Sequence, residues 1–189
     1  MPVQEDGKTK LLNPTKTKNK SMPRNSTLLL NSKQIQQRID RLAFQVYEDN
    51  FNQPELLIAG IAKSGFLFAE RLCEALKKIC PIPVKLIKIE VDKENPIKIK
   101  MSPLQEKEVL KDQTVIVVDD VLNSGKTLMY SLRPFLEADM RKIRTVLLVD
   151  RDHKRYPVEA DFVGITLSTT LQDHIRVDFS KGKEAVYLE

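Results

Sequence analysis

Residues 115–127 read VIVVDDVLNSGKT, and this stretch decides the fold of the chain. It begins with four consecutive β-branched residues, a run that is typical of a strand buried on both faces in a parallel sheet. Two carboxylates end the run, and Gly125 marks a tight turn into a helix that we expect over residues 126–137. The stretch therefore predicts an α/β fold built on a mostly parallel sheet.

The turn after this strand has the features of a sugar-phosphate site. Backbone N–H groups are unpaired at a helix N-terminus, so residues 123–127 can hold a phosphate, helped by the hydroxyls of Ser124 and Thr127. The carboxylates of Asp119 and Asp120 suit vicinal hydroxyls, or a cation shared with the ligand. A nucleotide-binding P-loop is excluded, because it needs glycine where Asp120 stands. Together these groups indicate a ribose 5-phosphate ligand.

A second strand, turn and helix precede the first. Residues 56–61 predict another buried strand, and Ala62, Lys63, Ser64 and Gly65 lead it into a helix expected over residues 66–77. An ordinary turn with a solvated lysine would give the same pattern. We favour a functional loop because open α/β sheets bind ligands beyond the carboxyl ends of their strands, where both turns would lie.

The main motif resembles the phosphoribosyl pyrophosphate (PRPP) signature of the type I phosphoribosyltransferases. The resemblance implies that the two aspartates face the ribose 2′- and 3′-hydroxyls, that the following loop wraps the 5′-phosphate, and that the earlier loop binds pyrophosphate, often across a cis non-proline peptide. Lys63 would supply charge there. The implied PRPP-binding residues are Asp119, Asp120, Val121, Leu122, Asn123, Ser124, Gly125, Lys126 and Thr127, with the two aspartates as the catalytic pair.

A third stretch narrows the resemblance. Residues 149–157 read VDRDHKRYP and residues 160–164 read ADFVG, which is similar to the C-terminal part of the pyrimidine-operon attenuator and uracil phosphoribosyltransferase family. The resemblance covers most of residues 30–189. It implies a central sheet flanked by helices with a small hood formed by the terminal segments, and it places Asp150, Arg151 and Phe162 at the base and hood. The pattern of the sequence also indicates two short strands, near residues 175–179 and 185–188.

Two departures from the family concern the base and the leaving group. Hypoxanthine-guanine members carry an aspartate that handles the purine proton where this chain has Asn123, which weighs against a purine. The flexible loop of the uracil members has Tyr and Arg, whereas residues 92–103 contain neither. Lys93, Lys98 and Lys100 are the cations available there, and because Lys does not replace the bidentate contacts of Arg, this departure bears on turnover more than on binding.

Composition separates a tail from a body. Residues 1–26 lack apolar periodicity and hold six Lys and Arg against two acidic residues, so most of the net charge of +5 lies in this expected basic disordered tail. Residues 27–189 form the predicted phosphoribosyltransferase domain. No signal peptide or long apolar run is present, which predicts a cytoplasmic protein without a membrane partner. RNA is left open as a partner, although the near-neutral body does not support it.

Three functions follow in order of preference. The first is transfer of a phosphoribosyl group from PRPP to a nitrogenous base, with uracil as the best single candidate. It implies Mg²⁺ held mainly by PRPP, with Asp119 and Asp120 acting through water, and we expect a dimer or tetramer. The second is a regulatory protein that senses PRPP or nucleotide and binds RNA with little turnover. The third is a nucleotide-phosphate binder whose loops have drifted.

Overall fold

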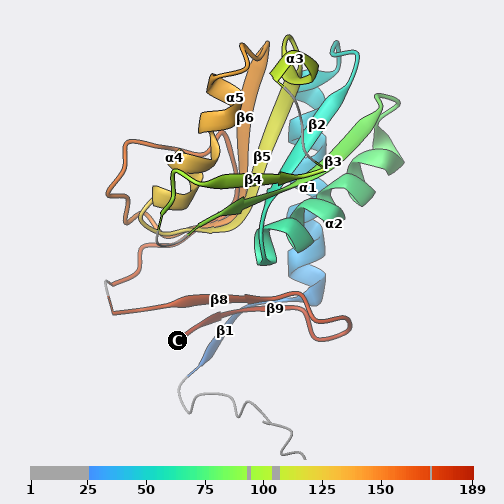
Figure 1. Ribbon diagram of the computed structural model, residues 1–189. Helices are drawn as coiled ribbons and strands as arrows, with labels where there is room; N and C mark the ends of the chain where they lie inside the picture. Colours follow the sequence, from blue (N-terminus) through green and yellow to red (C-terminus); the bar gives the residue numbers. More distant parts are fainter. Residues whose placement is uncertain (1–25, 93–94, 104–106, 171) are drawn as a thin grey trace, which may run out of the picture.

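A six-stranded sheet with helices on both faces and a separate three-stranded sheet make up the structure (Figure 1). The computed structural model describes residues 26–189, apart from 93–94, 104–106 and 171. The predicted tail thus lies outside the described residues except for Ser26. The α/β fold with a mostly parallel sheet is confirmed. In the described part of the chain, no helix combines the length and apolar character needed to cross a membrane.

The large sheet has the order β4-β3-β2-β5-β6-β7. Five of its strands are parallel, and only the edge strand β4 runs antiparallel to its neighbour. The strands are β2 (Leu56–Ile61), β3 (Val84–Val91), β4 (Ile99–Ser102), β5 (Thr114–Leu122), β6 (Lys142–Asp150) and β7 (Phe162–Thr166). The strand β2 has the bounds predicted for it. Because β2 and β5 are parallel neighbours, the two loops of interest leave the same edge of the sheet.

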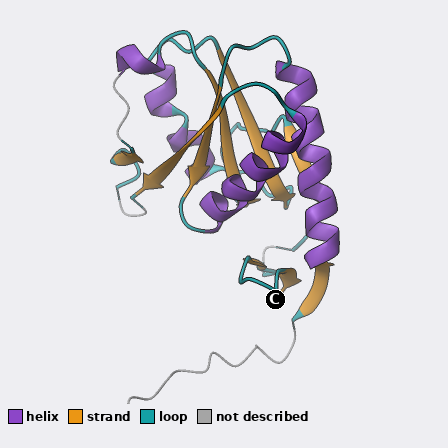
Figure 2. Ribbon diagram, turned by 90° about the vertical axis from the view of Figure 1, so that its right-hand side faces the viewer, coloured by secondary structure: helices purple, strands orange, loops and turns teal. Residues whose placement is uncertain are grey.

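Two hydrophobic cores lie on the two faces of this sheet, and Figure 2 shows helices on both sides of it. Successive strand side chains point to opposite faces, so Ile116 and Val118 join one core while Val115 and Val117 join the other. The first core packs under α1 (Ser32–Asn50) and α2 (Ser64–Ile79). The second core includes residues that belong to three short helices or lie directly beside them. These helices are α3 (Lys107–Leu110), α4 (Lys126–Ser131) and α5 (Arg133–Leu136).

The sequence-based bounds of three elements were wrong. Helix α2 spans Ser64–Ile79 rather than residues 66–77. The single helix expected over residues 126–137 is divided into α4 and α5 at Leu132. Pro134 has no N–H to donate to the carbonyl of Tyr130, and a proline also disfavours helical backbone in the residue before it, so the helix cannot continue unbroken. The strand also does not stop before the carboxylates, because β5 pairs with β6 as far as Leu122.

The three-stranded antiparallel sheet, β1-β9-β8, is the predicted hood. It joins the two ends of the described chain, with β1 (Thr27–Asn31) beside β9 (Ala185–Leu188) and β8 (Ile175–Asp178) beyond it. The sequence predicted β8 and β9 but not β1. Asn31 ends β1 and also caps α1 through reciprocal hydrogen bonds with Gln34, so the hood leads directly into the first helix.

Polar and aromatic contacts fix the hood onto α1 and α2. Glu184, which precedes β9, accepts a hydrogen bond from Ser32 Oγ (2.7 Å) and forms an ion pair with Arg71. The ring of Phe179 stacks on Phe68 with 6.3 Å between centroids, and the Arg71 guanidinium lies 5.5 Å from the Phe179 centroid. These contacts set where the hood stands relative to the sheet.

Replacing Glu184 with Gln is expected to lower the melting temperature by several degrees at neutral pH. The hydrogen bonds from Ser32 and Arg71 lower the pKa of Glu184 from 4.5 to about 2. A pKa that is lowered in the folded state stabilises the protein above pH 4.5, and this stabilisation is lost as the pH falls toward about 2. Melting curves between pH 2 and 8 should therefore show a gap between wild type and variant that closes on acidification. Glu70→Gln, at an exposed position on the same helix as Arg71, is the control and should show no such gap.

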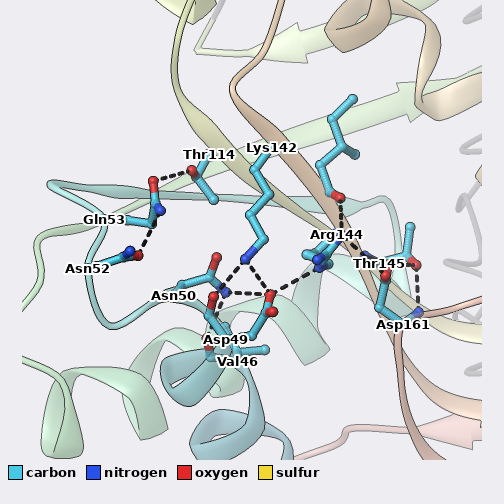
Figure 3. Close-up of polar contacts among 11 residues, drawn as sticks. Val46, Asp49, Asn50, Asn52, Gln53, Thr114, Lys142, Arg144, Thr145 and Asp161 are labelled. Carbon is cyan, nitrogen blue, oxygen red and sulfur yellow. Dashed lines mark hydrogen bonds and ion pairs between the residues drawn. The ribbon is translucent and has the colours of Figure 1, made fainter.

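At the end of the large sheet that lies opposite the hood, where the strands begin, ion pairs and hydrogen bonds join β6 to α1 and to the segment before β7 (Figure 3). Asp49, near the end of α1, pairs with Lys142 Nζ at 2.7 Å and with Arg144 Nε at 3.0 Å, both at the start of β6. Asp161 accepts hydrogen bonds from the N–H and hydroxyl of Thr145, each at 2.8 Å. Side chains at the amino ends of these strands thus make structural contacts, so we look for a functional site at the carboxyl ends.

Candidate functional site

A cavity of about 480 Å³ lies between the carboxyl edge of the large sheet and strand β8 of the hood. Its walls come from the ends of β2, β3 and β5, from the turns that follow them, and from β8. The lining residues are Ile61, Ala62, Ser64, Val91, Asp92, Pro96, Asp119, Asp120, Val121, Asn123, Ser124, Lys126, Thr127, His174, Ile175, Arg176 and Val177. The two loops identified in the sequence therefore share one cavity.

The two aspartates lie near the end of β5 and are half-buried. Burial, and after it the negative charge of Asp120, raise the pKa of Asp119 well above its usual range. Burial also raises the pKa of Asp120, although hydrogen bonds, including one from Ser64, offset part of the rise. Two neighbouring carboxylates that are partly withdrawn from water repel one another, so ligand hydroxyls or a cation that bind them would relieve an existing cost.

The loop of residues 123–127, here called the phosphate loop, turns from β5 into α4. Gly125 has a left-handed backbone with φ of 81°, and a side chain there would meet Val158 at 2.7 Å, so glycine is required on both counts. The N–H groups of Arg155 and Tyr156 donate to the Ser124 carbonyl at 2.9 and 3.1 Å. The loop is thus held from behind, while the predicted residues Val121, Asn123, Ser124, Lys126 and Thr127 face the cavity. Leu122 and Gly125 are buried beneath them.

The loop of residues 62–65, here called the pyrophosphate loop, faces the phosphate loop across the cavity. Ala62 and Ser64 line the cavity, whereas Lys63 is exposed at the start of α2. The Ala62–Lys63 peptide is cis, as the family resemblance implied. Gly65 packs so closely on β5 that a Cβ would stand 2.5 Å from Asp119 Oδ1. This contact fixes the distance between the two loops.

The predicted flexible loop is partly a hairpin. Strand β4 pairs with β3, which sets Lys100 opposite Glu90 on an exposed face, and Lys98 is exposed just before β4. Neither lysine lines the cavity, and Lys93 lies outside the described residues. Among the described residues of this loop, Asp92 and Pro96 reach the cavity.

None of the three residues assigned to the base and hood lines the cavity. Asp150 is buried and lies 3.3 Å from Lys154 Nζ, and Arg151 is buried behind the phosphate loop. Phe162 begins the edge strand β7, where it pairs with Val146 and packs against the α1 and α2 core, and it does not line the cavity. The segment beyond Phe162 first completes this sheet as β7, and only from β8 does it form part of the hood.

The hood residues that line the cavity were missed in the sequence analysis. They are His174, Ile175, Arg176 and Val177. The alternating pattern of residues 175–179 predicted a strand, but a strand pattern does not say which site the strand covers. Arg176 is held in place by the Tyr187 ring, 4.5 Å from its guanidinium, and by the carboxylate of Glu189.

The carboxylates of this cavity fit a cation carried in by a phosphorylated ligand. The described residues contain no cluster of three or more metal-ligating side chains. Magnesium, however, is commonly held by one or two carboxylates together with substrate phosphates rather than by an all-protein cage. The neighbouring pair Asp119 and Asp120, whose pKa values are raised by burial, provides such carboxylates.

Comparison with known proteins agrees with this geometry. The model of the phosphoribosyl transferase domain matches residues 25–180. A "Bifunctional protein PyrR" of Ligilactobacillus salivarius is 28% identical over 172 residues, which cover 85% of this chain and 97% of that protein. A protein of the same name from Clostridium acetobutylicum is 29% identical over 157 residues, which cover 79% of this chain and 88% of that protein.

Solved structures share the fold. A mutant of the hypoxanthine phosphoribosyltransferase of Trypanosoma cruzi, in a ternary complex with substrates, matches with a TM-score of 0.70 and 21% identity over 86% of this chain and 94% of that one. A hypoxanthine-guanine phosphoribosyltransferase of Bacillus anthracis matches with a TM-score of 0.63 and 22% identity over 75% and 84%. Given the domain match over most of its length, this chain belongs to the phosphoribosyltransferase family, as a PyrR-like member of type I.

Proposed function

We propose that the protein transfers a phosphoribosyl group from PRPP to a nitrogenous base, with uracil as the preferred acceptor. One observation carries the proposal: the paired carboxylates and the phosphate loop face the pyrophosphate loop in a single cavity that β8 covers. The cavity therefore offers separate groups to a sugar, to its 5′-phosphate and to a leaving group at C1. A base would enter on the side of β8.

The proposed reaction divides charge between two ends of the cavity. As the bond from ribose C1 to pyrophosphate breaks, C1 becomes electron-poor while negative charge grows on the leaving group. Asp119 and Asp120 would fix the ribose through its vicinal hydroxyls and favour the positive centre. Ser64 and the backbone at the N-terminus of α2 would receive the pyrophosphate, and Lys63 lies beside them. Positioning supplies much of the acceleration in such a reaction.

Mg²⁺ is the proposed cofactor. When bound, it would neutralise charge on the pyrophosphate. Residues Asp119 and Asp120 would hold it through water, with PRPP supplying most of the ligands. The described lysines of the loop between β3 and β5 do not line the cavity. The lack of Tyr and Arg in this loop therefore still bears on the rate of transfer.

The acceptor is argued from the resemblance and from the residues of the cavity. Asn123 stands where purine-using relatives are expected to have an aspartate, which favours a pyrimidine. His174 and Arg176 would face the base from β8. The cytoplasmic location, the homo-oligomeric state, the basic tail and the domain boundary at residue 27 remain predictions of the sequence.

Incubation with PRPP, Mg²⁺ and single bases tests the proposed function directly. Uracil, orotate, hypoxanthine, guanine, xanthine and adenine would be supplied separately, and nucleoside monophosphate would be detected by mass spectrometry. We expect uridine monophosphate from uracil alone. Product from another base would correct the acceptor, whereas no product from any base would contradict the transferase assignment.

A regulatory protein that binds RNA is the second candidate, and the name "Bifunctional protein PyrR" of the relatives favours a second activity. It predicts binding of a specific RNA whose affinity falls steeply with salt concentration. Filter binding at several salt concentrations, with a scrambled RNA of equal length, would measure this. Equal affinity for both RNAs would argue against it.

A further inference from the structure

Arg151 bridges two walls of the cavity without lining it. It directly follows β6, it is 7% exposed, and its N–H donates to the carbonyl of Leu122 at 3.2 Å. Its guanidinium lies between the phosphate loop and the chain segment that connects β7 to β8. A buried cation needs hydrogen-bond partners, so the identity of these partners indicates what the side chain does.

Each nitrogen of the guanidinium donates a hydrogen bond. Nη1 donates to Asn123 Oδ1 at 2.7 Å. On the other side, Nε donates to Thr169 Oγ1 at 3.0 Å, while Nη2 donates to the carbonyls of Thr170, at 3.0 Å, and of Asp173, at 2.5 Å. A ring nitrogen of His153 also contacts the Thr169 carbonyl. All the acceptors of Arg151 are neutral, and in the described part of the chain no carboxylate forms an ion pair with it.

The two ends of this bridge belong to different parts of the site. Asn123 is the first residue of the phosphate loop and lines the cavity. Asp173 immediately precedes His174, which lines the cavity where β8 begins. Between β7 and β8 the described residues form neither helix nor strand, so contacts with neighbouring segments, including those of Arg151, set the position of this connection. The planar fork of an arginine can hold several acceptors at fixed relative positions, which a lysine cannot do.

The bridge can transmit a restraint from one wall of the cavity to the other. An exposed Asn123 side chain can turn, and when it does the buried guanidinium loses an acceptor at a high cost. A phosphate bound to the loop restrains Asn123, so it also restrains Arg151 and the three residues that Arg151 holds. The start of β8 is then fixed in the place from which it would contact a base.

We propose that Arg151 is a positioning residue that couples occupancy of the phosphate loop to the ordering of the hood connection, formed by Thr169, Thr170, Asp173 and His174. The inference rests on the proposed function and deepens it, because it assigns a positioning residue to the same cavity.

Hydrogen exchange with ribose 5-phosphate as the probe tests the coupling without requiring turnover. The N–H of Thr170 donates to Asp173 Oδ2 at 2.6 Å, and that of His174 donates to the Glu189 carbonyl at 2.7 Å. In the wild-type protein, saturating ribose 5-phosphate should slow exchange in peptides that contain these residues on the order of tenfold, a typical coupling between sites. In Arg151→Lys, ribose 5-phosphate should still bind within about fivefold of the wild-type affinity, but the slowing should be lost.

Two further variants keep the test decisive. Arg155→Lys makes the same change at an exposed arginine whose backbone N–H donates to the Ser124 carbonyl, a bond that the substitution keeps, and it should retain the slowing. Asn123→Ala removes the other end of the bridge at an exposed position, so it should lose the slowing even if Arg151→Lys fails to fold.

The outcomes separate the coupling from the function. Failure of the wild-type protein to bind ribose 5-phosphate would overturn the proposed sugar-phosphate site, and the coupling with it. Binding without slower exchange in the wild type would overturn the coupling alone. Slower exchange that persists in Arg151→Lys and in Asn123→Ala would overturn the role of the bridge.

Discussion

Replacing Asp120 with Asn is expected to weaken the binding of ribose 5-phosphate and PRPP about 100-fold, because hydrogen bonds to a charged group contribute roughly 1.5–3 kcal/mol each. The amide keeps one oxygen but presents an N–H₂ group where a hydroxyl needs an acceptor. Stability should change in the opposite direction. Burial and the charge of Asp120 already raise the pKa of Asp119, so removing that charge relieves repulsion and should leave the melting temperature equal or higher.

Titration calorimetry with ribose 5-phosphate and a melting curve of each protein would measure both effects. Asp139→Asn is the matched control, since Asp139 is exposed in the turn before β6 and has a left-handed backbone with φ of 54°, which asparagine tolerates. It should bind like the wild type. An unchanged affinity in Asp120→Asn would refute the assignment of the ribose to this carboxylate pair.

Replacing Gly65 with Ala is expected to abolish measurable PRPP binding and to cost about 1–3 kcal/mol of folding free energy. The added Cβ would stand 2.5 Å from Asp119 Oδ1 and 3.0 Å from Asp119 Cα. A flexible side chain could turn aside, but Asp119 belongs to β5, which is paired on both sides within the sheet. The start of α2 must therefore move, and it carries Ser64 and the pyrophosphate loop away from the carboxylates.

Denaturant titration and equilibrium dialysis with PRPP would test this prediction. Gly182→Ala is the control, because a Cβ there meets no atom within 4 Å. Its φ of +78° still makes alanine strained, at roughly 1–2 kcal/mol, so this variant should lose stability and keep its affinity. If Gly65→Ala binds PRPP as tightly as Gly182→Ala does, the close packing of the two loops is not needed for the site.

Short-range features of the site could be predicted from the sequence. The carboxylate pair lies near the end of β5 and the phosphate loop follows that strand directly, while the pyrophosphate loop directly follows β2. Each of these features is therefore made of neighbouring residues. The bounds of β2 and β9 agree with the predicted ones for the same reason, since an apolar run bounded by turn residues identifies a strand locally. Parallel pairing then brings both loops to one edge.

Other features depended on partners far along the chain. Strand β1 was not predicted, since it forms by pairing with β9 at the other end of the chain. Phe162 was assigned to the hood because it belongs to a family motif, but the register of β7 places it beside Val146, where it packs against the core. The sequence of the predicted flexible loop did not show that β4 pairs with β3 in a register that places Lys100 opposite Glu90 and away from the cavity.

The sequence by itself determined the fold class, the carboxylate pair and the two anion-binding loops, because strand patterns, turn glycines and helix starts act over a few neighbouring residues. Only the tertiary structure decided what covers the cavity. Residues 174–177 of β8 come to it through the antiparallel hood, and Arg151 joins Asn123 to Asp173 across separations of 28 and 22 residues. Periodicity reports which side of an element is buried, whereas the partner on that side is chosen by the packing of the whole chain.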